Sequence, residues 1–205
     1  MADVTAKGLK ILMSIRSSKK FAVAAALAMS TVAASTANAA LIQFSYSGNA
    51  SGTWLSGIYS GQSFTAQPFT ITASSLTELI APLGPAAIMA PHSATFMSIA
   101  GYGSFSANSQ LATFVNNSAG RVGLTVVGQS DVVSFGNSAF ETWNMQASVG
   151  PVTGTGVFNT QTIFTTFGAL RFTGSAPVTF SANVVPAPGA IALLGLAGLS
   201  GRRRR

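Results

Sequence analysis

The chain has 205 residues, no cysteine and a formal net charge of +7. This charge belongs to the two ends, because residues 40–201 contain three acidic and two basic side chains: Glu78, Asp131, Glu141, Arg121 and Arg171. Two arginines cannot neutralise the several phosphates that a nucleic-acid partner presents, so nucleic-acid binding is excluded. The lack of cysteine also excludes thiol catalysis and cysteine-based metal sites.

Residues 1–39 have the pattern of a secretory signal peptide. Five basic residues precede an alanine-rich apolar run over 21–34, and Ala37-Asn38-Ala39 matches the A-x-A cleavage pattern. We expect export through the Sec translocon and cleavage by signal peptidase before Ala40. The apolar run is short, which favours cleavage over an uncleaved membrane anchor. Met13 would serve as well as Met1 as the first residue.

The body from residue 40 to residue 184 has the pattern of short strands. Apolar and polar residues alternate in its first half, and β-branched runs follow in its second half. The predicted strands cover 42–47, 69–73, 122–127, 131–135, 140–145, 162–166, 170–173 and 178–184. These patterns predict an all-β fold, specifically a small antiparallel sandwich that is jelly-roll-like or Ig-like.

Glycine, proline, asparagine and serine separate these strands as turn residues, for example at 128–130, 136–138 and 150–151. We expect Gly154-Thr155-Gly156 to be a turn as well, because no phosphate-loop motif continues it. Only residues 76–89 have helical periodicity. Pro82 and Pro85 limit that segment to one short turn.

The body offers little for catalysis. His92 is the only histidine, in a predicted loop, and we expect it to be exposed. One histidine without cysteine cannot form a histidine-rich metal site, and no catalytic motif is present, so we predict no metal, no cofactor and no enzyme activity. The alternative is a secreted hydrolase of polysaccharide, which would use Asp131 and Glu141 as its pair of carboxylates.

Aromatic residues are the candidates for glycan contact. An aromatic ring offers an apolar surface to a sugar, and neighbouring Ser, Thr and Asn side chains supply hydrogen bonds. Trp54 and Tyr59 lie in a Ser/Gly-rich segment, so we expect them to be exposed and to contact the glycan. Trp143 is expected to pack in the core.

The last 21 residues have three parts in a fixed order. Val185-Pro186-Ala187-Pro188-Gly189 is a stiff entry, residues 190–201 are apolar and uncharged, and Arg202, Arg203, Arg204 and Arg205 follow. As a helix, residues 186–201 would be about 24 Å long at ~1.5 Å per residue, close to the thickness of a hydrocarbon core. The arginines would stay on the cytoplasmic side and leave the body outside the inner membrane.

This tail resembles the PEP-CTERM sorting signal of Gram-negative bacteria, with Ala187 in the place of the motif's Glu. The resemblance implies an exosortase-type enzyme as a partner and an association with exopolysaccharide, biofilm or the cell surface. The chain is then expected to comprise a signal peptide (1–39), a β body (40–184) and a sorting segment (185–205). We therefore expect a non-enzymatic envelope or extracellular-matrix protein, anchored first in the inner membrane with its body in the periplasm and then delivered to the surface.

Overall fold

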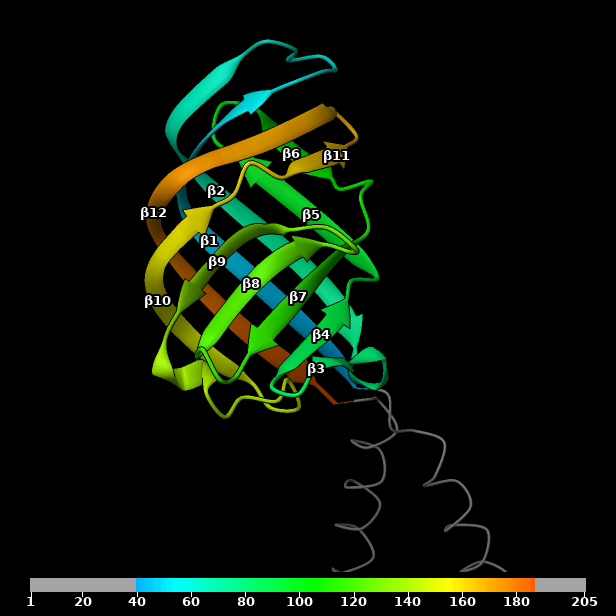
Figure 1. The fold of residues 1–205 in the computed structure, drawn as a ribbon. Coiled ribbons are helices and arrows are strands. Elements are labelled where there is room, and N and C mark those ends of the chain that lie inside the picture. Colours follow the sequence, from blue (N-terminus) through cyan, green and yellow to red (C-terminus); the bar gives the residue numbers. More distant parts are fainter. Residues whose placement is uncertain (1–39, 187–205) are drawn as a thin grey trace, which may run out of the picture. The chain divides into compact units, whose positions relative to one another are not determined.

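The computed structural model describes residues 40–186, which form one antiparallel sheet of twelve strands (Figure 1). Two short 3-10 helices, η1 (Thr77–Leu79) and η2 (Ser138–Phe140), lie between strands. The prediction of an all-β fold is confirmed. The strands are β1 (Leu41–Trp54), β2 (Ser63–Leu76), β3 (Ala81–Gly84), β4 (Ala87–Pro91), β5 (Ala94–Ile99), β6 (Gly103–Ser106), β7 (Leu111–Asn116), β8 (Arg121–Val126), β9 (Asp131–Gly136), β10 (Val149–Phe158), β11 (Thr162–Thr165) and β12 (Gly168–Val185).

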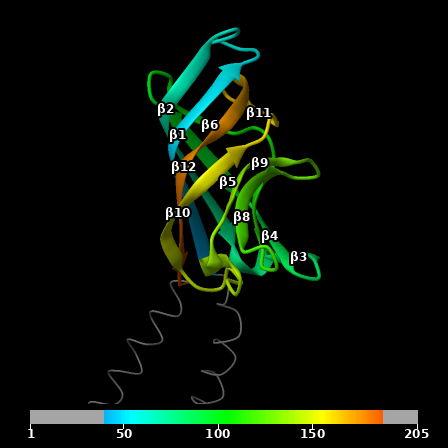
Figure 2. The ribbon, with the colours of Figure 1, turned by 60° about the vertical axis from the view of Figure 1, so that its left-hand side comes forward.

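The sheet is continuous and curls on itself. Its strands follow the order β3-β4-β7-β8-β9-β10-β12-β1-β2-β5-β6, and β11 pairs with β12. Figures 1 and 2 show that β7, β8 and β9 lie across the core from β1, β2 and β12. Ser75 Oγ of β2 donates to Pro91 O of β4 at 2.6 Å, and an isolated bridge joins Ala107 to Thr165. A sheet must cover its apolar face, and here one half of the sheet covers the other.

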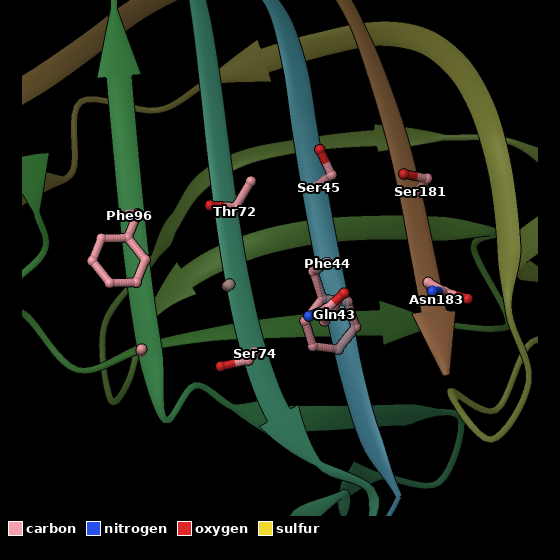
Figure 3. A pocket seen from close by; sticks show the side chains of 10 residues that line it. Gln43, Phe44, Ser45, Thr72, Ser74, Phe96, Ser181 and Asn183 are labelled. Atoms are coloured by element: carbon pink, nitrogen blue, oxygen red, sulfur yellow. The ribbon is translucent and has the colours of Figure 1, made fainter. Parts of the chain in front are cut away.

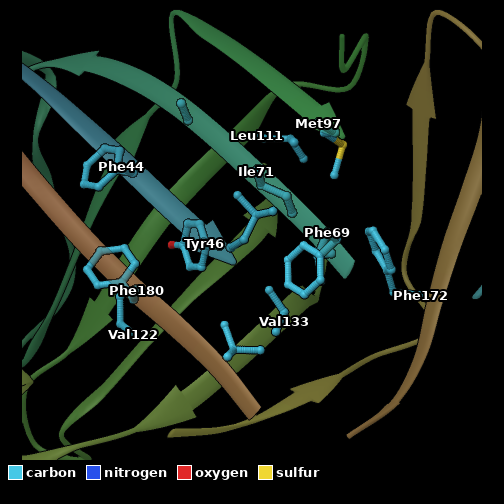
Figure 4. Packing of buried hydrophobic residues seen from close by; sticks show 14 of the residues in the cluster. Phe44, Tyr46, Phe69, Ile71, Met97, Leu111, Val122, Val133, Phe172 and Phe180 are labelled. Carbon is cyan, nitrogen blue, oxygen red and sulfur yellow. The ribbon is translucent and has the colours of Figure 1, made fainter. Parts of the chain in front are cut away.

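Alternation along β1 decides which of its side chains enter the core. In β1, Phe44 and Tyr46 are buried, whereas Gln43 and Ser45 face outward. Figure 4 shows the rings of Phe44, Tyr46 and Phe180 gathered between the two halves of the sheet, and the Tyr46 and Phe180 centroids are 4.9 Å apart. Burial of each such side chain contributes about 1.5–3 kcal/mol, so this aromatic core is the main source of stability in the body.

Most predicted strands correspond to observed strands. The segments 42–47, 69–73, 122–127, 131–135 and 162–166 coincide with β1, β2, β8, β9 and β11 or with parts of them, to within one residue. The segments 170–173 and 178–184 are two parts of the single strand β12. The single short turn predicted within 76–89 is η1, which has three residues.

The predicted strand over 140–145 is wrong. Phe140 ends η2, and Phe140, Trp143 and Met145 are all buried, a spacing that strand alternation cannot produce. Asn117 Nδ2 donates to Phe140 O at 2.7 Å and to Trp143 O at 2.9 Å. These bonds pair the carbonyl groups of Phe140 and Trp143, so the segment forms a loop without a partner strand.

The turn predicted at Gly154-Thr155-Gly156 is also wrong, because these residues lie inside β10. A Cβ atom on Gly154 would lie 2.3 Å from Phe135 Cδ2. The glycine therefore makes room for an aromatic ring of β9. The turn predicted at 150–151 is a register shift within β10, between Val149 and Val152.

β1 and β12 pair along their length, so Leu41 lies opposite Val185 at the two ends of the body. The predicted signal peptide, with Ala37 and Ala39, lies outside the described residues, as does the sorting segment from Ala187 to Arg205. Of the predicted sorting motif, Val185 ends β12 and Pro186 follows it. Within residues 40–186, no helix is long and apolar enough to cross a membrane.

Candidate functional site

The outer face of β12, β1, β2 and β5 carries polar side chains in register across the strands. Because strand neighbours on one face lie directly opposite each other, the pairing fixes rows that run across the sheet. The Ser45 row is Ser181, Ser45, Thr72 and Phe96. The Gln43 row, two residues along each strand, is Asn183, Gln43, Ser74 and Ala94.

These two rows line a hollow of about 440 Å³ on the outer face, shown in Figure 3. The volume lies within the range of about 300–1,000 Å³ that is typical of small-molecule sites. Figure 3 shows Ser45, Thr72 and Ser181 on the same side of the sheet as Phe96, while Phe44 lies behind them toward the core. Side chains of β12, β1, β2 and β5, and no loop residue, therefore form the hollow.

The polar groups of the hollow have free hydrogen-bonding capacity. Among residues 40–186, no side-chain hydrogen bond is found for Gln43, Ser45, Thr72, Ser74 or Ser181. Asn183 Oδ1 accepts from Ser148 Oγ at 3.2 Å, which leaves its amide N–H₂ free. Each hydroxyl can donate once and accept twice, and each amide both donates and accepts, so the hollow can bond a ligand that presents hydroxyl groups.

The lining has no ionisable side chain and one exposed aromatic ring. Phe96, on β5 at one edge of the hollow, is 59% exposed. A phenyl ring next to free hydroxyls and amides matches the two surfaces of a sugar, which has apolar C–H faces and a polar rim. The absence of charge from the lining matches a neutral ligand.

The prediction that Trp54 is exposed is wrong, because its exposed fraction is 0%. Its indole ring packs against Tyr59 and Phe105, with centroids 5.4 and 5.2 Å away. Tyr59 is half-buried, and its hydroxyl donates to Tyr102 O at 3.3 Å. The segment after β1 folds back over Trp54, because Gly61 N donates to Trp54 O and Trp54 N donates to Gln62 O. Neither aromatic residue lines the hollow.

The prediction that His92 is exposed is also wrong. It lies in the turn between β4 and β5, but its side chain is 7% exposed and its ring is 5.6 Å from that of Phe44. His92 Nδ1 is 2.9 Å from Thr95 Oγ1, and Nε2 is 3.0 Å from Thr113 Oγ1. Burial lowers the pKa of His92 from 6.5 to about 3, so the imidazole is neutral at physiological pH.

The geometry assigns the protons of this buried network. Tyr46 Oη donates to Gly123 O at 3.1 Å, so Tyr46 must accept from Thr113 Oγ1 at 3.0 Å. Thr113 has then used its only proton and accepts from His92 Nε2, and Thr95 donates to Nδ1. Burial also raises the pKa of the Tyr46 hydroxyl, against the smaller lowering effect of its bond to Thr113. The network is internal and structural, and it presents no nucleophile to a ligand.

The two carboxylates proposed for hydrolysis lie at opposite ends of β9. Asp131 begins the strand, and its Oδ2 accepts from Ser134 Oγ at 3.2 Å and is 3.9 Å from Arg121 Nη2. Glu141 follows the far end of β9, beside Gly120. The strand between them spans about 16 Å at ~3.3 Å per residue. Neither carboxylate lines the hollow.

Trp143 is buried, as predicted, and its Nε1 donates to Ala147 O at 2.8 Å. Over residues 40–186, no group of three His, Cys, Asp or Glu side chains could hold a metal ion. The sequence pattern revealed the polar positions of β1 and β2 but did not predict β5, so it missed Phe96.

Comparison with protein-family models, with curated proteins and with solved structures finds no match to this chain.

Proposed function

We propose that this chain is an exported, surface-sorted and non-enzymatic protein of the envelope or extracellular matrix, and that its body binds a neutral polysaccharide in the hollow. The observation that carries the binding proposal is the lining of the hollow, where free hydroxyls and amides lie beside an exposed phenyl ring without any charge. A charged polymer would find no ion-pair partner there, whereas a neutral polyhydroxylated one finds both hydrogen bonds and an apolar contact.

The export and sorting part of the proposal rests on the two terminal patterns. The A-x-A pattern before Ala40 supports secretion and cleavage. The Val185–Gly189 entry, the apolar run and the four arginines support an inner-membrane-anchored precursor that an exosortase-type enzyme processes. We include in the same proposal the jelly-roll-like or Ig-like sandwich architecture, which is consistent with the way the two halves of the curled sheet enclose one core.

Binding is tested with the purified chain and immobilised neutral polysaccharides. Phe96→Ala should weaken binding about tenfold, which corresponds to ~1.4 kcal/mol, because it removes the apolar contact in the hollow. Phe164→Ala is the matched control, since Phe164 is also 59% exposed but lies on β11, away from the hollow. Equal binding by the Phe96→Ala variant and the wild type would place the site elsewhere or remove it.

Sorting is tested by replacing Arg202–Arg205 with serine in the expressing cell. Loss of the positive charge should impair membrane retention or processing of the precursor. A variant with lysine at the same four positions is the control, because it keeps the charge and should fractionate as the wild type does. If the serine variant also fractionates as the wild type does, the tail is not a charge-stopped sorting segment.

A further inference from the structure

A longer row of hydroxyl groups lies next to the hollow on the same outer face. Strand pairing places one Ser or Thr residue from each of six adjacent strands, β10, β12, β1, β2, β5 and β6, opposite the next. We call this the Ser47 row, and its members are Thr153, Thr179, Ser47, Thr70, Ser98 and Ser104. No other residue type interrupts the row.

The Ser47 row borders the hollow along its whole width. Ser47 and Thr70 are each two residues along their strand from Ser45 and Thr72, so the two rows are about 7 Å apart at ~3.3 Å per residue. The Ser47 row also extends one strand beyond the hollow on each side, to β10 and β6. At ~4.8 Å between strands, its six members span about 24 Å.

The hydroxyls of this row are accessible and mostly unpaired. Thr70, Ser104 and Thr153 are exposed, and the other members are half-buried. The one side-chain bond found for the row within residues 40–186 joins Thr153 to Thr179 at 2.9 Å, and one hydroxyl proton of that pair stays free. The row adds hydrogen-bonding groups in a line, without adding charge.

We propose that the polysaccharide binds as a single extended chain that crosses the strands along the Ser47 row, with the hollow beside its four central sugar units. This inference rests on the proposed function. The face is hollowed, so it fits one chain better than the flat surface of a crystalline polymer. A hexose unit in an extended chain is comparable in length to the strand spacing, so successive units can each meet one strand.

The inference predicts that affinity depends on chain length. The probe is an array of neutral gluco-, manno- and galacto-oligosaccharides from disaccharide to octasaccharide, read with the full chain. Affinity should rise with length up to roughly six units, one for each strand of the row, and then level off. The double variant Ser47→Ala/Thr70→Val should flatten this rise, and affinity for the longest oligosaccharides should fall about tenfold toward that of the shortest.

Thr65→Val is the matched control, because Thr65 is exposed on β2 but belongs to neither the hollow nor the Ser47 row. Circular dichroism and thermal unfolding check that each variant is folded. Length-independent binding that Phe96→Ala still weakens would overturn the extended-chain inference and leave the proposed function standing. Failure to bind any member of the array, or immobilised neutral polysaccharide, would overturn both.

Discussion

Acid should destabilise this protein as the pH falls below about 6.5, because of His92. It is the only histidine of the chain, and burial lowers its pKa from 6.5 to about 3. For a base whose pKa is lower in the folded state, the unfolded chain binds a proton first. Stability is therefore fully present above pH 6.5 and is lost as the pH falls from 6.5 toward 3.

The size of this effect follows from the shift. For each pH unit below 6.5, the free energy of unfolding falls by up to about 1.4 kcal/mol. Between neutral pH and pH 5 the free energy of unfolding should fall by about 2 kcal/mol, a large part of the ~5–15 kcal/mol that a domain has. The midpoint of thermal unfolding should fall by about 6 °C for a body of this size.

The assay is urea denaturation at a series of pH values from neutral to about pH 5, on the wild type and on His92→Gln. The glutamine variant should be less stable at neutral pH, but its stability should change little over this range, because the only histidine has been removed. Nuclear magnetic resonance of the imidazole in the folded wild type gives a second readout, since the ring should stay neutral at pH 5. Constant wild-type stability over this range, or an imidazole that titrates near 6.5, would refute the burial argument.

Two further substitutions test the packing of the core. Tyr46→Phe keeps the ring but removes the hydroxyl group, which forms hydrogen bonds with Thr113 Oγ1 and Gly123 O. The free energy of unfolding should fall by about 2 kcal/mol, and a fall of less than ~0.5 kcal/mol would contradict the network. Gly154→Ala places a methyl group 2.3 Å from an atom of the Phe135 ring, so the free energy of unfolding should fall by about 1–3 kcal/mol. Gly84→Ala is the control and should leave stability unchanged, because no atom lies within 4 Å of the added methyl group. Equal losses of stability in the two variants would refute the close approach.

Local patterns predicted β1 and β2 because strand alternation has a period of two and can be read from neighbouring residues. They predicted β8 and β9 because β-branched residues form short runs there. The same patterns failed at 140–145 and at Gly154-Thr155-Gly156. In the first segment, Asn117 from a distant turn holds the backbone as a loop. In the second, Gly154 leaves room for the Phe135 ring and Gly156 for the Val178 side chain, both on neighbouring strands. The sequence does not show whether a glycine is needed for a turn or for a close contact.

Sequence analysis predicted less of the candidate site than of the fold. Trp54 and His92 were expected to be exposed, yet both are buried, because residues distant in the sequence cover them. Phe96 lies on β5, which was not among the predicted strands, and its place beside the polar rows follows only from the pairing of β5 with β2.

The sequence by itself determined the all-β class, the low charge of the body and which residues of β1 and β2 face the core, because these depend on composition and on a two-residue period. The secretion and sorting of the chain stay predictions from its terminal patterns. The tertiary structure alone decided the hollow and the Ser47 row. Their residues come from strands far apart in the sequence, from Gln43 to Asn183, and it is strand pairing and register, which are non-local, that place them side by side.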